Sequence, residues 1–405
     1  MANNLKIKSI KAREILDSRG NPTIEVELET NLGSFLASVP SGASKGKHEA
    51  VELRNKKAIK NINEVIAPKL IGKDPTKQKE IDDLMIELDG TENKSKLGAN
   101  AICGVSMVVC RAGAFSQNLP LYQHVFQCNE ERARYIIPKA CFNIINGGIH
   151  AGNELDFQEF MVVPQKKFFS ENLRIGKEIY FKLKEILFKR YGKKGIQLGD
   201  EGGFASPIRF PEEAIELILE AAKKLNYEIK IILDVAASQF FKNGKYQMKI
   251  GVFTREGLLR YYEKLIKNYP ILGIEDPFSE DDWEGWKMAN GRLPMANFLI
   301  IGDDLTVTNP ERIKEAKEKK ACNAMIIKIN QVGTVSEAIT ATKLARSFNW
   351  KVIVSHRSGE TTDSFISDFA VGVGAEFIKA GAPAKKERMA KYQRLLEIEE
   401  ELDKN

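Results

Sequence analysis

The sequence predicts an α/β protein in which an N-terminal α+β domain precedes a (β/α) barrel. Two patterns support this prediction. Between residues 231 and 384, a short apolar run rich in Val and Ile recurs six times, at the spacing of one strand plus one helix. Such a repeat is typical of buried parallel strands joined by crossover helices. Residues 5–39 instead alternate apolar and polar side chains, as antiparallel strands with one solvated face do.

The first predicted domain covers residues 1–132 and begins with strands. Ile24, Val26 and Leu28 alternate with glutamates, which predicts an antiparallel hairpin or meander. The segment PSGASKGKHEA, residues 40–50, is rich in small residues, and we interpret it as a mobile loop that can act as a lid. From residue 61 to about residue 116, apolar residues recur at helical spacing, with breaks near Pro68 and Pro75 that divide the pattern into several helices.

The second predicted domain covers residues 133–405. Its first apolar run, YIIPKACFNIIN, stops at a glycine-rich segment that ends in His150, and FQEFMVVP then presents Gln158 and Glu159. A long helix is expected before GIQLGDEGGFA, which carries Glu201, and a further helix over residues 210–225. The six recurring runs follow, and the chain becomes helical again after residue 384. The length of 405 residues leaves room for a barrel-sized core.

Each of the six runs ends at an acidic or basic side chain. In chain order these residues are Asp234, Glu275, Asp303, Lys328, His356 and Lys379. In a (β/α) barrel the C-terminal ends of the strands all lie at one mouth. We therefore expect three carboxylates, two lysines and a histidine to converge there.

Asp234, Glu275 and Asp303 are hard oxygen ligands at three successive strand ends. This donor set suits Mg²⁺ far better than Zn²⁺. The alternative for any one of them is a helix cap or a salt-bridge acid, because acidic residues often follow strands. The interpretation that all three are helix caps is disfavoured.

Lys328 and Lys379 end strands that are expected to be buried, where lysine seldom lies without a partner. Two ammonium groups close to each other and to metal ions are expected to have lowered pKa values, which would make one of them a base at neutral pH. Alternatively, both merely neutralise the carboxylates. His356, Arg357 and Ser358 are interpreted as an anion cradle suited to phosphate, although a lone histidine after a strand is more often structural.

Glu159 and Glu201 are expected to reach the mouth from earlier strands and to face the lysines. A lysine on one side, a glutamate on the other and Mg²⁺ between them are suited to removing a proton beside a carboxylate and expelling a β-hydroxyl. The metal charge is needed because that proton is very weakly acidic.

Composition narrows the class of protein. Apolar residues make up 43% and charged residues 29% of the chain, as in soluble globular proteins. We find no signal peptide and no 18-residue apolar run, and we expect the five cysteines to be reduced core residues of a cytosolic protein. The net charge of +6 comes from scattered basic residues. Their one local excess, residues 164–195, is interpreted as the solvated face of an amphipathic helix, in preference to a nucleic-acid site. The apolar, buried face of this helix is expected to include Tyr180, Phe181 and Leu183.

The chain contains a series of long motifs that together span nearly the whole sequence: ILDSRGNPTIEVE, PSGASKGKHEA, NGGIHAGN, QEFM, GDEGGFA, LDVAAS, IEDP, GDDLTVTN, KINQVGT, SHRSGET and KAGAPAKKER. In these motifs and their order, the chain resembles the enolase family. The resemblance implies a (β/α)8 barrel with one antiparallel strand, and the Mg²⁺-dependent, reversible dehydration of 2-phosphoglycerate to phosphoenolpyruvate in glycolysis and gluconeogenesis. It also implies two Mg²⁺ ions per site, a cytoplasmic location, a homodimer or larger dimer-based assembly, and no membrane or nucleic-acid partner.

The resemblance also implies a role for each matched residue. Lys328 is the base, and Glu201, supported by Glu159, is the acid. The ligands of the first Mg²⁺ are Asp234, Glu275 and Asp303, and Ser44 of the lid binds the second. The residues that contact substrate are His150, Gln158, His356, Arg357, Ser358 and Lys379. The chain differs from the usual family pattern in a shorter segment between residues 53 and 61, in lysines in the lid and in a short C-terminus, none of which removes a matched residue.

Two other classes of function remain as alternatives. A dehydratase or racemase acting on a sugar acid or an amino acid is disfavoured by SHRSGET, because those substrates carry no phosphate. A non-enzymatic scaffold that uses the basic helix on RNA or a protein partner is disfavoured because every matched polar residue is present.

Overall fold

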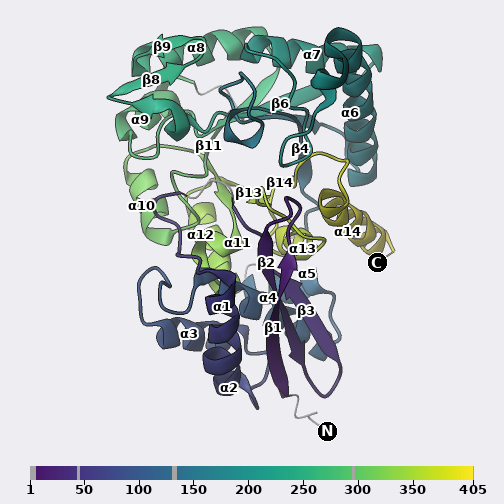
Figure 1. Ribbon diagram of the computed structural model, residues 1–405, viewed down its shortest axis with the longest axis vertical. Coiled ribbons are helices and arrows are strands. Elements are labelled where there is room, and N and C mark those ends of the chain that lie inside the picture. The colour runs from purple at the N-terminus through teal and green to yellow at the C-terminus, as the bar shows by residue number, and fades with distance from the viewer. Residues whose placement is uncertain (1–5, 43–45, 130–134, 294–296, 405) are drawn as a thin grey trace.

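The structure, a computed structural model, describes residues 6–42, 46–129, 135–293 and 297–404. Within these ranges the chain forms a small α+β part, at the bottom of Figure 1, and a larger barrel above it. The boundary predicted between residues 132 and 133 lies in residues 130–134, outside the described ranges.

The N-terminal part is built on a three-stranded antiparallel sheet. Its strands are β1 (Ser9–Leu16), β2 (Pro22–Glu29) and β3 (Ser34–Ser38), in that spatial order. Ile24, Val26 and Leu28 are completely buried on one face, as the alternation predicted. The helices that follow are α1 (Asn55–Asn61), the π-helical turn η1 (Ile62–Ile66), α2 (Ala67–Leu70), α3 (Gln78–Asp89), α4 (Ala99–Ser116) and α5 (Leu121–Asn129).

Helix α4 packs on this sheet. A Cβ atom on Gly104 would lie only 2.7 Å from Cγ2 of Val26, so the glycine allows the helix to approach the strand closely. By length and composition α4 could cross a membrane, contrary to our expectation that no such run exists, but 83% of it is buried inside the protein. We therefore assign it as a core helix.

The second part is a closed barrel of eight strands in the order β10-β11-β12-β13-β14-β4-β5-β6. The strands are β4 (Lys139–Asn146), β5 (Glu159–Pro164), β6 (Ile229–Asp234), β10 (Ile271–Glu275), β11 (Leu299–Gly302), β12 (Ala324–Ile327), β13 (Lys351–Ser355) and β14 (Phe377–Lys379). Only β5 runs antiparallel to its neighbours. The predicted α/β class and the single antiparallel strand are both confirmed.

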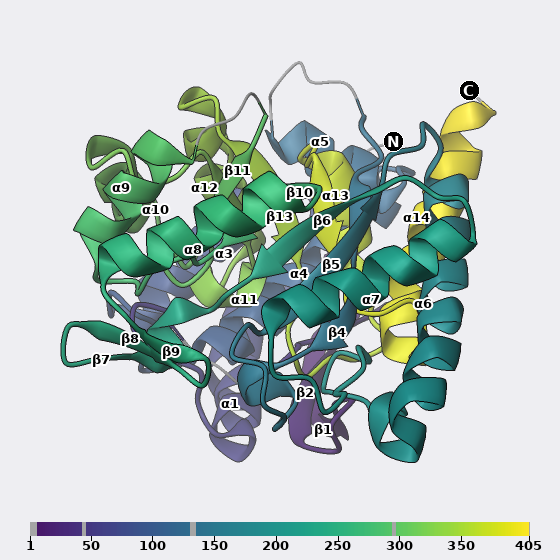
Figure 2. The ribbon, with the colours of Figure 1, turned by 90° about the horizontal axis from the view of Figure 1, so that it is seen from above.

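Helices surround the barrel, as Figure 2 shows from above. They are α6 (Phe169–Tyr191), α7 (Pro211–Lys224), α8 (Arg255–Asn268), α9 (Trp283–Arg292), α10 (Pro310–Glu318), α11 (Ile329–Val332), α12 (Val335–Ser347), α13 (Phe365–Gly372) and α14 (Lys386–Asp403). Short 3₁₀ turns are η2 (Gly148–His150), η3 (Gly192–Ile196) and η4 (Ala237–Phe240), and a small sheet contains β7 (Phe241–Lys242), β8 (Lys245–Met248) and β9 (Gly251–Phe253).

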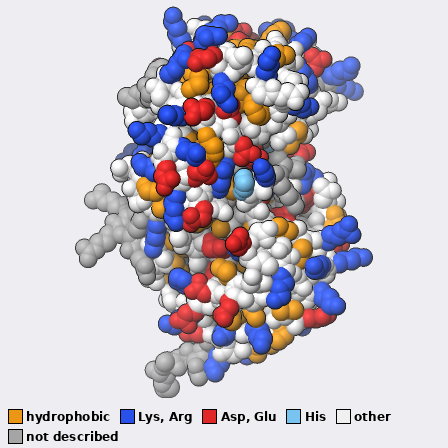
Figure 3. All heavy atoms as spheres, turned by 90° about the vertical axis from the view of Figure 1, so that its left-hand side faces the viewer, with side chains coloured by type: hydrophobic (Ala, Val, Ile, Leu, Met, Phe, Trp, Pro, Cys, Tyr) orange, Lys and Arg blue, Asp and Glu red, His pale blue; other side chains and the backbone are white. Residues whose placement is uncertain are grey.

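The basic helix α6 is amphipathic, as predicted. Tyr180 and Leu183 are buried against the barrel, but Phe181 is 51% exposed, so its assignment to the buried face was wrong. Adjacent helical positions point about 100° apart, which turns Phe181 away from the core. Lys182 pairs with Glu185 at 2.5 Å on the outer face, as expected for a solvated helix. On the face of the molecule drawn in Figure 3, basic and acidic side chains are likewise interspersed.

Buried polar contacts join the two parts. Arg111 of α4 forms two 2.7 Å hydrogen bonds with the Asp363 carboxylate near the start of α13. Asp82 of α3 accepts a hydrogen bond from the backbone N–H of Ser336 on α12 at 3.1 Å and from Gln78. Burial raises the pKa of Asp82 from 3.8 to about 6, even though these donors lower it.

The stability of Asp82→Asn relative to wild type is expected to rise as the pH rises from about 4 to above 6. The folded state binds a proton on Asp82 more tightly than the unfolded chain does. Wild type therefore loses about 3 kcal/mol from this group as the pH rises from about 4 to above 6, whereas asparagine does not titrate. The measurement is the difference in Tm between variant and wild type from pH 4.5 to 7.5, which is expected to move in favour of the variant. Asp83→Asn, at an exposed neighbour on the same helix, is the control; a Tm difference for Asp82→Asn that does not depend on pH would contradict the prediction.

Candidate active site

The predicted polar residues meet at the mouth of the barrel. Asp234, Glu275 and Lys379 are the last residues of β6, β10 and β14. Asp303, Lys328 and His356 directly follow β11, β12 and β13. Because β5 is antiparallel, its first residue, Glu159, lies beside the last residue of β6 and joins them. This register explains how an early strand contributes to a mouth formed by strand C-termini.

One pocket at this mouth collects nearly all the predicted site residues. They are His150, Gln158, Glu159, Glu201, Asp234, Asp303, Lys328, His356, Arg357, Ser358 and Lys379. Glu275 does not line the pocket but contacts Lys379, with Nζ 2.8 Å from Oε1. Ser44 lies outside the described residues.

The two lysines lie among the carboxylates. Nζ of Lys379 is 3.1 Å from Oδ2 of Asp234 and 3.2 Å from Oε2 of Glu159, in addition to its contact with Glu275. Nζ of Lys328 forms an ion pair with Asp303.

The pKa values of both lysines are raised, contrary to the sequence-based expectation. Burial lowers the pKa of each lysine, but the Asp303 carboxylate outweighs burial at Lys328, and Asp234 and Glu159 outweigh it at Lys379. The expectation assumed that the carboxylate charge would be taken up by metal ions. With carboxylates as the nearest charges, the ammonium forms are favoured instead.

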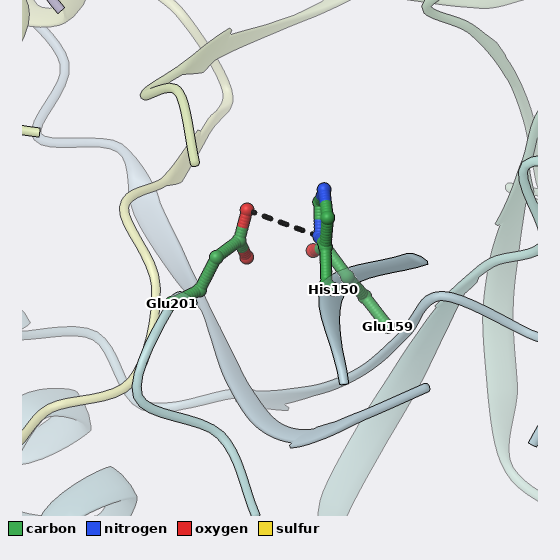
Figure 4. Close-up of side chains that lie close together, drawn as sticks. All are labelled: His150, Glu159 and Glu201. Carbon is green, nitrogen blue, oxygen red and sulfur yellow. Dashed lines mark ion pairs between the residues drawn. The ribbon is translucent and has the colours of Figure 1, made fainter. Parts of the chain in front are cut away.

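Glu159, Glu201 and His150 form a compact group (Figure 4), in which their ligand atoms all lie within 4.8 Å of one another. Nδ1 of His150 is 3.6 Å from Oε1 of Glu201 and 3.9 Å from Oε1 of Glu159. Glu201 belongs to the turn that follows η3, so our expectation that it ends a strand was wrong. Because Gly199 and Gly203 pair backbone to backbone at 2.8 Å, this turn is closed locally.

The two glutamates have opposite proton affinities. Burial raises the pKa of Glu159 well above its ordinary value, and the Glu201 carboxylate adds to the rise. Burial also raises the pKa of Glu201, but the imidazoles of His356 and His150 outweigh it and hold that pKa well below its ordinary value. The pair therefore holds one proton, which rests on Glu159.

Arg357 is reached by a side chain from the N-terminal part. Its Nη1 lies 3.0 Å from Oε2 of Glu49, and both residues are buried at this contact. Gly46 N also donates to Glu49 Oε1 at 2.9 Å, and Ala50 N donates to the carbonyl of Gln331 at 2.9 Å. The described residues of the predicted lid, 40–42 and 46–50, thus contact the mouth of the barrel directly.

Comparison with known proteins agrees with this geometry. Residues 7–125 match the family model described as the enolase N-terminal domain, and residues 134–405 match the enolase C-terminal TIM barrel domain. A relative named enolase, from Mastigamoeba balamuthi, is 51% identical over 425 aligned residues, which cover 98% of this chain and 96% of the relative. The chain belongs to the enolase family. Enolase activity, a lyase reaction of glycolysis, follows from similarity of this extent.

Membership in the enolase family implies a divalent metal ion, and the donor set of the mouth fits one. Asp276, Asp303 and Asp304 could hold a cation, because one oxygen of each lies within 4.8 Å of the others. Asp234 and Glu275 add carboxylates that pair with Lys379. Oxygen-rich, carboxylate sites of this kind suit hard cations.

Sequence reasoning missed several residues of this enolase-family site. Asp276 and Asp304 line the pocket beside the predicted Glu275 and Asp303, and the doubled acids in IEDP and GDDL were the available signal. Asp276 has a φ of 42° and accepts hydrogen bonds from the backbone N–H groups of Asp303 at 3.0 Å and Asp304 at 2.8 Å. A left-handed aspartate thereby fixes the neighbouring strand end. Gln239 was also missed, and no motif marked it.

Proposed function

We propose that the chain is a phosphopyruvate hydratase that uses Mg²⁺ to dehydrate 2-phosphoglycerate reversibly to phosphoenolpyruvate. The observation that supports this most directly is the placement of opposite functional groups across the mouth. In the closed barrel, three strands lie between β12 and β5 in either direction, so Lys328 faces Glu159 and its partner Glu201. A substrate between them has a base on one side and an acid on the other.

Each residue then has a defined task. Lys328, once neutral, takes the C2 proton on its Nζ. Glu201 donates a proton to the C3 hydroxyl, which leaves as water, and Glu159, only 4.8 Å or less from it, holds the proton that restores Glu201. Because the base and the acid are separate groups on opposite sides of the mouth, the base does not take its proton from the acid.

The remaining predicted residues bind and orient the substrate. Arg357 and Ser358, with His356 beside them, hold the phosphate, because a guanidinium matches phosphate oxygens with paired donors. His150, Gln158 and Lys379 contact the substrate from the same pocket. Both ring nitrogens of His150 and Oε1 of Gln158 have no hydrogen-bond partner among the described residues, which leaves them available.

We further propose two Mg²⁺ ions per site, the first held by Asp234, Glu275 and Asp303 and the second by Ser44. The bound metal supplies the positive charge that stabilises the enediolate and favours the neutral form of nearby lysines. The enzyme's part is to hold three carboxylates from adjacent strand ends, which leaves room for substrate oxygens.

We propose that the chain forms a homodimer or a larger dimer-based oligomer in the cytoplasm. Within each chain, we place the domain boundary between residues 132 and 133. The family resemblance supports these proposals, and all five cysteines are free thiols, as in a reducing compartment. The only ligand class proposed is a phosphorylated small molecule, without a membrane or nucleic-acid partner.

Phosphoenolpyruvate formation is expected to depend strictly on Mg²⁺. Added 2-phosphoglycerate should raise the absorbance at 240 nm when Mg²⁺ is present, and a chelator in excess should stop the rise. Restoring Mg²⁺ should restore it, which distinguishes metal removal from denaturation. No metal-dependent rise with any divalent cation would contradict the proposal.

A further inference from the structure

Arg388, on α14, is a completely buried arginine beside the active site. Its Nη1 lies 2.5 Å from Nδ1 of His356 and donates to the carbonyl of Arg357 at 2.7 Å. Its Nη2 donates to the carbonyl of Ser358 at 2.7 Å and to that of Asp200 at 3.3 Å. The guanidinium therefore joins the loop after β13 to the turn that carries Glu201.

These partners are unusual for a buried cation. A buried charge normally has a carboxylate partner, because desolvation is costly. Arg388 uses its hydrogen bonds on three carbonyl oxygens and an imidazole nitrogen instead. The three carbonyl contacts hold the loop after β13 and the turn of Asp200 in place. The contact with His356 also limits which ring nitrogen of that histidine can carry a proton.

The constraint concerns which nitrogen of His356 carries the proton. A guanidinium has five donors and no acceptor. Nδ1 of His356 must therefore offer its lone pair to Arg388, and the proton of the neutral ring must sit on Nε2. Burial lowers the pKa of His356 to about 4, so the ring is neutral at pH 7.

Nε2 of His356 lies near Glu201. Nε2 lies 3.4 Å from Oε2 of Glu201, and Nδ2 of Asn143 donates to that same oxygen at 2.8 Å. The other oxygen, Oε1, is turned towards His150, 3.6 Å away (Figure 4). One N–H group, that of Asn143, thus donates to Oε2, and Nε2 of His356 lies beside the same oxygen without hydrogen-bond geometry, whereas Oε1 lies towards His150.

We propose that Arg388 is a positioning residue that holds His356 in the Nε2–H tautomer and thereby assigns separate roles to the two oxygens of Glu201. Oε2 accepts hydrogen bonds, and Oε1 relays the proton that rests on Glu159. During dehydration that proton passes from Glu159 to Oε1 of Glu201 and from there to the C3 hydroxyl, which leaves as water, and Glu159 becomes a carboxylate. This inference rests on the proposed acid role of Glu201.

The tautomer can be read directly by solid-state ¹⁵N NMR of Mg²⁺-loaded enzyme labelled only at histidine. The chain has four histidines, and a His356→Gln sample identifies the His356 signals. At pH 7, wild type is expected to show a protonated Nε2 and an unprotonated Nδ1. In Arg388→Met, Nδ1 loses its donor, and signals of both neutral tautomers are expected.

Lys385→Met is the matched control. Lys385 is also a cation at the start of α14 and contacts the same Asp200 carbonyl, at 3.3 Å, but it does not contact His356. Its removal should leave the His356 signals unchanged. A protonated Nδ1 in wild type, or unchanged His356 signals in Arg388→Met, would overturn the proposal. The wild-type spectrum decides the tautomer even if Arg388→Met fails to fold.

Kinetics test the consequence for Glu201. Arg388→Met is expected to slow dehydration roughly 10- to 100-fold while exchange of the C2 hydrogen with solvent changes less than about threefold. A purely structural role would instead lower both rates together or raise KM alone, and either result would overturn the proposal. Loss of exchange in Glu201→Gln would contradict the acid role itself, whereas the NMR result for Arg388 does not depend on that role.

Discussion

Lys328→Ala is expected to reduce phosphoenolpyruvate formation by about 100- to 10,000-fold, the range over which a general base contributes to a rate. Lys328 follows β12, and its Nζ is held by Asp303 at the mouth of the barrel. Alanine leaves no group there that can accept the C2 proton. Exchange of the C2 hydrogen of 2-phosphoglycerate with deuterium from solvent should therefore fall together with the rise in absorbance at 240 nm.

Lys94→Ala is the matched control for this experiment. Lys94 is also buried and ion-paired, with Nζ 2.7 Å from Oε1 of Glu337, but it lies between the two parts of the chain and outside the pocket. Its loss should lower Tm without changing the ratio of exchange to dehydration. If C2 exchange persists in Lys328→Ala, the base is a different residue, and Lys379 is the other lysine that lines the pocket.

Glu201→Gln is expected to lower the dehydration rate by a similar factor of about 100 to 10,000 while C2 exchange continues. Glutamine has the size and shape of glutamate, but it cannot donate a carboxylic proton to the C3 hydroxyl. Lys328 and its surroundings are untouched, so the C2 proton can still be removed and replaced. The measurements are deuterium incorporation at C2 and product formation on the same sample.

Asp200→Asn provides the comparison, because Asp200 is the preceding residue of the same turn and its side chain is 33% exposed. That variant should retain both rates. If exchange and dehydration fall equally in Glu201→Gln, Glu201 acts before or during proton abstraction, and the proposed division of labour between base and acid is wrong.

The sequence contained much of the fold and most of the candidate site. The six apolar runs could be assigned as strands because a barrel strand must be buried along its length, and their terminal polar residues could be placed together because parallel strands share one end. The antiparallel direction of β5 came from family resemblance alone, since a short apolar run has no direction. The exposed Phe181 was misassigned because adjacent helical positions point about 100° apart, and on α6 Tyr180 takes the position that faces the core.

Contacts between distant residues were not accessible to the same reasoning. Glu201 was singled out as a site residue, but its place in a turn depends on backbone pairing with residues nearby in space. Arg388 is the last residue of the motif KAGAPAKKER, but nothing local indicated that it would be buried against His356, 2.5 Å away.

By itself, the sequence determined which residues stand at the strand ends and that carboxylates, lysines and the segment of residues 356–358, proposed to bind phosphate, share one mouth. Periodicity and strand polarity are properties of the local chain, so they can be read without a structure. Only the tertiary structure decided which charges are partners. Lys328 lies against Asp303 and Lys379 against Asp234, and both lysine pKa values are therefore raised and not lowered. The reason is physical: electrostatic energy depends on the separation and burial of charges, and folding sets both.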